Sequence, residues 1–84
     1  MITPTLNING SSPKDLIDPR MEARDFIRSA IEAMLKATPN GRDYPGNNSA
    51  CVTDRITHYD RIETLSRIGH ELMQEAVAIL EQTK

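Results

Sequence analysis

The chain has 84 residues, with ten basic and twelve acidic side chains and a formal net charge of −2 at pH 7. A chain this short forms one domain (1–84), and its weakly acidic balance gives no overall attraction for nucleic acid, which must be bound by neutralising several phosphates. The single cysteine, Cys51, excludes an internal disulfide and a zinc site with several cysteines.

The apolar residues form no segment typical of a membrane or secretory protein. The longest apolar run, Ala76–Leu80, is too short to cross a bilayer, and Met1–Thr5 lacks the basic start and apolar stretch of a signal peptide. We therefore expect a soluble, cytoplasmic protein with no membrane partner.

Residues 1–12 have the composition of an irregular arm. Asn9-Gly10 is a turn signal, whereas Leu6 and Ile8 alternate with polar residues. Such alternation is compatible with an extended segment, so the arm is expected to lie along the helices.

A first helix is predicted over residues 13–37, with a break near residue 19. Ser12-Pro13 and Asp18-Pro19 are both pairs of a capping residue and a first-turn proline, and Pro19 has no backbone N–H to donate. Either a short turn over 13–17 precedes a main helix that begins at Pro19, or a single helix kinks there. Apolar residues recur at helical spacing in the main segment: Ala23, Phe26, Ile27, Ala30, Ile31, Met34 and Leu35.

Residues 38–49 are rich in proline, glycine and asparagine and are predicted to be a loop between two antiparallel helices. The second helix, 50–82, has a seam with alternating four- and three-residue steps, typical of coiled coils, in His58, Ile62, Leu65, Gly69, Leu72, Ala76 and Ile79. Further apolar residues make this stripe wider than one helix can cover: Val52, Ile56, Tyr59, Ile68, Met73 and Leu80. The prediction is an all-α hairpin that forms a homo-oligomer through its long second helix.

Gly69 stands out within that seam because glycine costs about 1 kcal/mol in a helix interior. A close crossing between two helices explains its presence, and a kink in the second helix explains it equally well. The sequence leaves both interpretations open.

The residue types that carry catalysis are poorly placed for it. His58 and His70 are twelve residues apart, too far along a helix to share a metal ion, and Cys51 is about 10 Å from His58 along the axis. Cys51 is expected to be a small apolar residue. The chain has no nucleophile elbow, phosphate-binding glycine loop or apolar carboxylate pair, so we expect no enzyme activity, no metal and no cofactor.

Two groups of residues are candidates for binding an anion. In the loop, Arg42 is suited to a phosphate or carboxylate and Tyr44 to stacking on a base. The alternative is that Arg42 and Asp43 cap the neighbouring helix ends while Tyr44 folds back over the hairpin tip. On the first helix, Arg20, Arg24 and Arg28 form a ladder of like charges at four-residue spacing. The ladder is either a solvated face or an anion site completed by Arg61 or Arg67.

The segment Ala37–Tyr44, followed by His58-x-x-Arg61 and Leu65, resembles small phage and prophage proteins in which an arm like Asn9-Gly10-Ser11 precedes a helix–loop–helix. This resemblance covers nearly the whole chain and implies a bacterial host; Pro19 departs from the smoother first helix of that pattern. A weaker likeness, in length, helical content and oligomeric build, is to viral cyclic-nucleotide sponges.

These observations together favour a non-enzymatic phage accessory protein that counters host defence. It is expected to sequester a small anionic signal of the cyclic-nucleotide type at subunit interfaces, through Arg42, Asp43, Tyr44, His58 and Arg61. Two alternatives are a protein–protein inhibitor of a host defence complex, as anti-CRISPR proteins are, and a structural oligomeric phage component.

Overall fold

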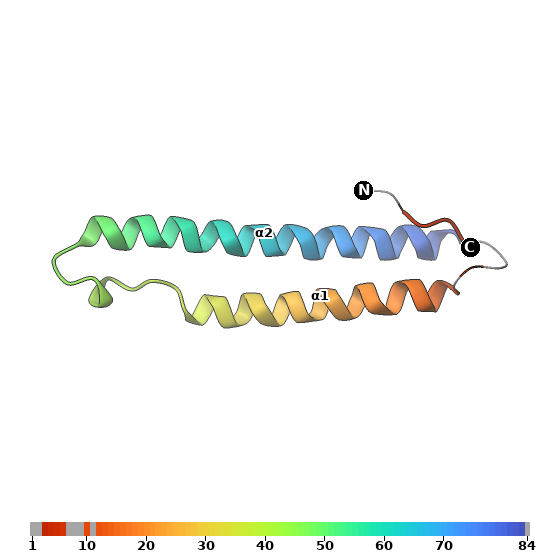
Figure 1. The fold of residues 1–84 in the computed structure, drawn as a ribbon, viewed down its shortest axis with the longest axis horizontal. Coiled ribbons are helices and arrows are strands. Elements are labelled where there is room, and N and C mark those ends of the chain that lie inside the picture. Colours follow the sequence, from red (N-terminus) through yellow and green to blue (C-terminus); the bar gives the residue numbers. More distant parts are fainter. Residues whose placement is uncertain (1–2, 7–9, 11, 84) are drawn as a thin grey trace.

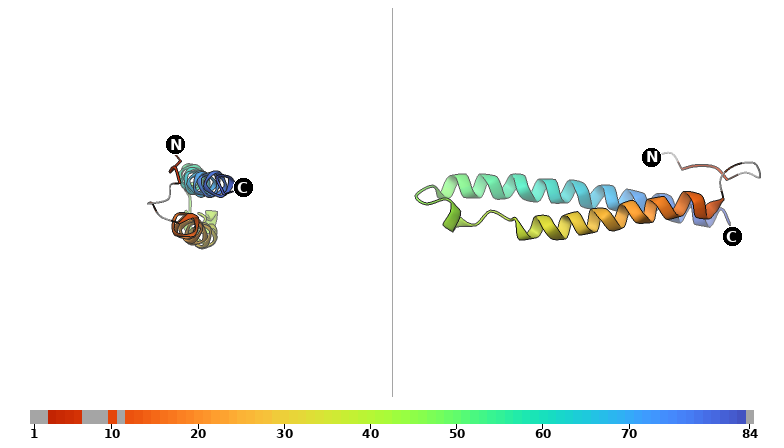
Figure 2. Two further views of the ribbon diagram at one scale, coloured as in Figure 1. Left: turned by 90° about the vertical axis from the view of Figure 1, so that its right-hand side faces the viewer. Right: turned by 60° about the horizontal axis from the view of Figure 1, so that its bottom comes forward.

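The computed structural model describes residues 3–6, 10 and 12–83, and it has two helices, α1 (Pro13–Lys36) and α2 (Asn48–Glu81). The two helices run antiparallel and side by side, as both the side view and the end-on view make plain (Figures 1 and 2). The described residues form no strand, and the predicted all-α helical hairpin is confirmed. The hairpin is a long rod that measures 64 × 19 × 18 Å.

α1 begins at Pro13 and continues through Pro19, so the alternative in which a separate turn over 13–17 precedes a main helix from Pro19 is wrong. The first of the two capping signals starts the helix, because the Ser12 hydroxyl accepts a hydrogen bond from the Asp15 N–H at 3.2 Å. Next to Pro19, the Arg20 guanidinium donates to the Leu16 carbonyl (2.7 Å) within the same turn of α1. This hydrogen bond offsets part of the local cost of an interior proline.

An ion pair between Arg20 and Glu75 attaches this part of α1 to α2. The Arg20 guanidinium lies 3.8 Å from the Glu75 carboxylate of α2, and both side chains are largely shielded from solvent. A partly shielded pair between two helices fixes their relative height more effectively than an exposed pair does, because water screens it less.

The seam of α2 packs on α1 along the length of the hairpin. Its buried residues, Gly69, Ala76 and Ile79, follow the predicted three- and four-residue steps. A Cβ atom on Gly69 would lie 3.6 Å from the Ile27 Cγ2 atom of α1, an ordinary van der Waals distance. α2 is continuous through this point, so Gly69 marks the place where α1 passes rather than an interruption of α2.

The loop runs beside the first turns of α2, beyond the end of α1. With 24 residues α1 is about 36 Å long, whereas the 34 residues of α2 span about 51 Å. The loop follows the uncovered end of α2 (Figure 1), and the Pro39 carbonyl accepts a hydrogen bond from the Arg55 Nε atom (2.8 Å). The loop thus covers part of α2 that α1 is too short to reach.

The turn back into α2 depends on local capping. A short 3-10 helix, η1 (Gly41–Asp43), is capped by the Asn40 side chain, and Gly46 has the positive φ (71°) that a residue without a side chain adopts easily. Asn47 then caps α2 by accepting from the Ala50 N–H (3.1 Å).

The described part of the arm lies against the last turn of α2. The Gln82 side-chain amide accepts from the Leu6 N–H (2.9 Å) and donates to the Pro4 carbonyl (2.8 Å). Residues 3–6 of the arm therefore lie against the end of α2, whereas Ile8 of the alternating pattern is outside the described residues. Asn9 and Ser11, which carry the predicted turn motif, lie outside the described residues. Neither helix has an apolar stretch of the length that a membrane crossing requires, within the part of the chain described.

Replacing Gly69 with alanine should stabilise the hairpin. The added Cβ finds ordinary contact with Ile27, and alanine is more favourable than glycine in a helix interior by about 1 kcal/mol. Urea unfolding followed by circular dichroism should show a gain of up to about that size. Gly69→Leu is the control, because its bulk must separate the helices and lower the free energy of unfolding. A loss of stability in Gly69→Ala would mean that the crossing is tighter than described.

Candidate functional site

Tyr44 follows η1 and connects the loop to α2. Its hydroxyl donates to the Asp54 Oδ2 atom of α2 at 2.6 Å, and its ring is half-buried. This hydrogen bond to a carboxylate, helped by desolvation, raises the pKa of Tyr44 from 10.0 to about 12. Tyr44 therefore joins the loop to α2 instead of presenting a free phenol to a ligand.

His58 also serves the fold. Its Nε2 atom lies 2.6 Å from the carbonyl oxygen of Met34, near the C-terminal end of α1. A carbonyl can only accept, so Nε2 carries the proton and donates it. His58 thus satisfies one of the last carbonyls of α1 and ties the two helices together where α1 ends.

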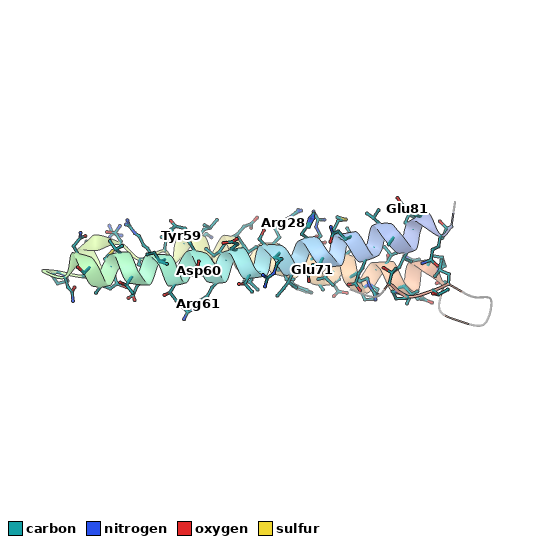
Figure 3. The ribbon with its side chains drawn as sticks, turned by 90° about the horizontal axis from the view of Figure 1, so that it is seen from above. Arg28, Tyr59, Asp60, Arg61, Glu71 and Glu81 are labelled. Atoms are coloured by element: carbon teal, nitrogen blue, oxygen red, sulfur yellow. The ribbon has the colours of Figure 1, made fainter. Side chains whose placement is uncertain are left out.

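The other three residues predicted to bind the ligand, Arg42, Asp43 and Arg61, are exposed to solvent. Arg42 and Asp43 are exposed on η1, where the backbone N–H of Arg42 donates to the Asn40 side chain (3.0 Å). Arg61 is exposed on α2 and projects from the edge opposite to Tyr59 (Figure 3). The structure therefore does not gather the five predicted residues around one cavity.

A groove lies between the two helices near the middle of the hairpin, away from the five predicted residues. Its volume is about 260 Å³ and it opens to solvent on one side. α1 lines it with Arg24, Ile27, Arg28 and Ile31, and α2 with Ser66, Gly69, His70 and Met73. Gly69 contributes to its depth because no side chain projects there. The groove combines an apolar floor with cationic and hydrogen-bonding groups, which is the usual composition of a small-molecule site.

The cationic character of the groove comes from the arginine ladder. Arg20 forms an ion pair with Glu75, whereas Arg24 and Arg28 have no carboxylate within 4 Å among the described residues. Two guanidinium groups one helical turn apart repel each other, and an anion between them would remove that repulsion. Arg24 and Arg28 are therefore candidates for holding an anion in this groove.

The sequence indicated this site only in part. The spacing of the ladder identified the arginines, but the predicted completing residues were Arg61 or Arg67, and α2 supplies Ser66 and His70 to the groove instead. The signal for them is their spacing: Ser66, His70 and Met73 follow one another at four- and three-residue steps, one position along from the seam at Leu65, Gly69 and Leu72.

Comparison of the chain with protein families, with curated proteins and with solved structures found no match to any of them.

The Tyr44 hydrogen bond can be tested by titration. In a Tyr59→Phe background only one phenol remains, and its ultraviolet absorbance should titrate at about pH 12. Since the pKa is raised on folding, the stabilisation is present below about pH 10 and is lost as the pH rises through 12. Adding Asp54→Asn should move the midpoint back toward 10, whereas Asp60→Asn, on an exposed part of α2, should leave it alone. A midpoint insensitive to Asp54 would show that this hydrogen bond does not form.

Proposed function

We propose that this protein works by binding rather than by catalysis, sequestering a small anionic ligand in the groove between α1 and α2. The observation that carries the proposal is the position of Arg24 and Arg28 at one groove that Ile27, Ile31 and Met73 also line. Guanidinium groups bind carboxylates and phosphates through paired hydrogen bonds, and the apolar floor suits a ring or short chain attached to the anion.

The positions of the reactive side chains support binding without turnover. Cys51 is 2% exposed and His58 is held by Met34, so neither is presented to a substrate. Ser66 and His70 share the groove, but no hydrogen bond joins them within the described residues, whereas an activated hydroxyl requires contact with its base.

The ligand that we propose is a phosphate-bearing signal of the cyclic-nucleotide type, in keeping with the resemblance of Ala37–Tyr44 to phage proteins. The volume of about 260 Å³ is slightly below the range of about 300–1,000 Å³ usual for ligand sites. One hairpin thus encloses part of such a ligand, and a further wall is needed to enclose the rest. Sequestration at a subunit interface supplies that wall.

The exposed η1 turn supports a second candidate function. Arg42 and Asp43 are exposed to solvent on η1, whose first turn is capped by Asn40. An exposed turn with charged side chains is suited to recognition by another protein, as required of an inhibitor of a host defence complex.

Binding should depend on Arg28 and not on Arg61. Loss of a charged hydrogen bond of about 1.5–3 kcal/mol weakens binding by roughly ten- to a hundredfold, so calorimetric titration of Arg28→Ala with a cyclic dinucleotide should show that loss. Arg61→Ala removes the same charge from the opposite edge of α2 and is the matched control.

The ligand itself is best sought in protein purified from cells, by mass spectrometry of what heat denaturation releases. A released anion that binds wild type and Arg28→Ala equally would exclude the groove. If Arg42→Ala alone weakened binding, the ligand would belong to the loop. Absence of any bound or titratable anion would favour the protein–protein inhibitor.

A further inference from the structure

α2 carries a second seam beside the one that packs on α1. It repeats every seven residues through Val52, Tyr59, Ser66, Met73 and Leu80, with a second set at Ile56, Glu63, His70 and Val77. Five of its six apolar residues remain between 45% and 60% exposed (Val52, Ile56, Tyr59, Val77 and Leu80), and the sixth, Met73, is half-buried. A helix with two adjacent seams is built to contact two neighbours, and the hairpin provides only one.

This second seam has nearly the same pattern when read from either end. Three apolar residues come first (Val52, Ile56, Tyr59), three polar residues occupy the middle (Glu63, Ser66, His70), and three apolar residues come last (Met73, Val77, Leu80). Ser66 is the centre: Tyr59 and Met73 are seven residues to either side, and Val52 and Leu80 are fourteen. A partner that presents the same pattern in reverse is a second copy of this chain, placed antiparallel.

We propose that two hairpins pack the second seams of their α2 helices antiparallel, around a two-fold axis near Ser66, and so form a four-helix bundle. The apolar ends then cover each other, and Glu63 of each copy lies across from His70 of the other. A parallel pairing would cover the apolar ends equally well, but it would place Glu63 against Glu63, so charge selects the antiparallel arrangement. The same surface patch is used by both copies, as in most soluble dimers.

The dimer also completes the groove. Ser66, His70 and Met73 belong both to the second seam and to the groove lining, and Arg28 lies at the same edge of the hairpin as Tyr59 (Figure 3). The second copy therefore lies over the groove mouth and supplies its missing wall. This last step rests on the proposed function, whereas the packing of the two copies does not.

Disulfide cross-linking tests the direction of the two helices. In a Cys51→Ala background, Ser66→Cys should form a covalent dimer with itself on mild oxidation, because both copies place this residue near the axis. Val52→Cys alone should not, since its two copies are about 42 Å apart along the axis, far beyond the Cα separation of less than 7 Å that a disulfide needs. A mixture of Val52→Cys and Leu80→Cys proteins should cross-link with each other.

The outcomes separate the alternatives. Self-cross-linking of Val52→Cys would show a parallel dimer and overturn the proposal, and so would the absence of cross-links from Ser66→Cys. Phe26→Cys is the matched control: Phe26 is 67% exposed and lies about 200° around α1 from Arg28, on the other side of the hairpin. A cross-link there equal to that of Ser66→Cys would indicate only random collision.

A second variant tests the face without a disulfide. Tyr59→Asp should raise the dimer dissociation constant at least a hundredfold in analytical ultracentrifugation, because it buries one unpaired carboxylate per copy. Phe26→Asp should leave the constant within about twofold, and circular dichroism should show both variants folded. Equal effects of the two changes would overturn the assignment of the face. These measurements need no ligand, so an antiparallel dimer that binds no anion would contradict the proposed function alone.

Discussion

Small residues on α2 let its backbone lie directly beside α1, and this close approach organises the hairpin. Gly69 and Ala76 are buried along the contact, with the Ile27 methyl 3.6 Å from where a Gly69 Cβ would be, and Ile79 is fully buried at the far end. Contacts at both ends of α1 fix its height, through Arg20 and Glu75 near its start and through His58 near its end. Gly69 also lines the groove, because its missing side chain leaves space beside Ile27.

A layer of two helices cannot enclose many side chains, and this limit shapes the remaining surface. Among the described residues only Cys51, Ala76 and Ile79 form the buried hydrophobic core. Small domains with so little buried area usually gain stability from disulfides, metals or association, and the single cysteine excludes the first. The exposed apolar residues of α2 are therefore best understood as an interface in the proposed dimer.

The sequence was sufficient to predict the two helices, because their apolar periodicity persists over many turns. It left open whether one helix runs through Pro19 or the main helix begins there, because the hydrogen bond from Arg20 to the Leu16 carbonyl is not visible in the sequence. The loop candidates were chosen by residue type, and Tyr44 and His58 proved to bind Asp54 and Met34, partners that only the three-dimensional arrangement identifies. Ser66 and His70 were missed as groove residues because their role depends on which side of α2 faces the arginines of α1.

The central claim, that the second seam of α2 is covered by a second copy lying alongside, is tested most directly by small-angle X-ray scattering. The account predicts a forward scattering that corresponds to twice the 9.4 kDa chain mass, with a longest dimension only slightly greater than the 64 Å of one hairpin. A mass of one chain would contradict it. A doubled mass with a dimension close to twice 64 Å would contradict it as well, since that shape means contact between the ends of the hairpins and not along α2.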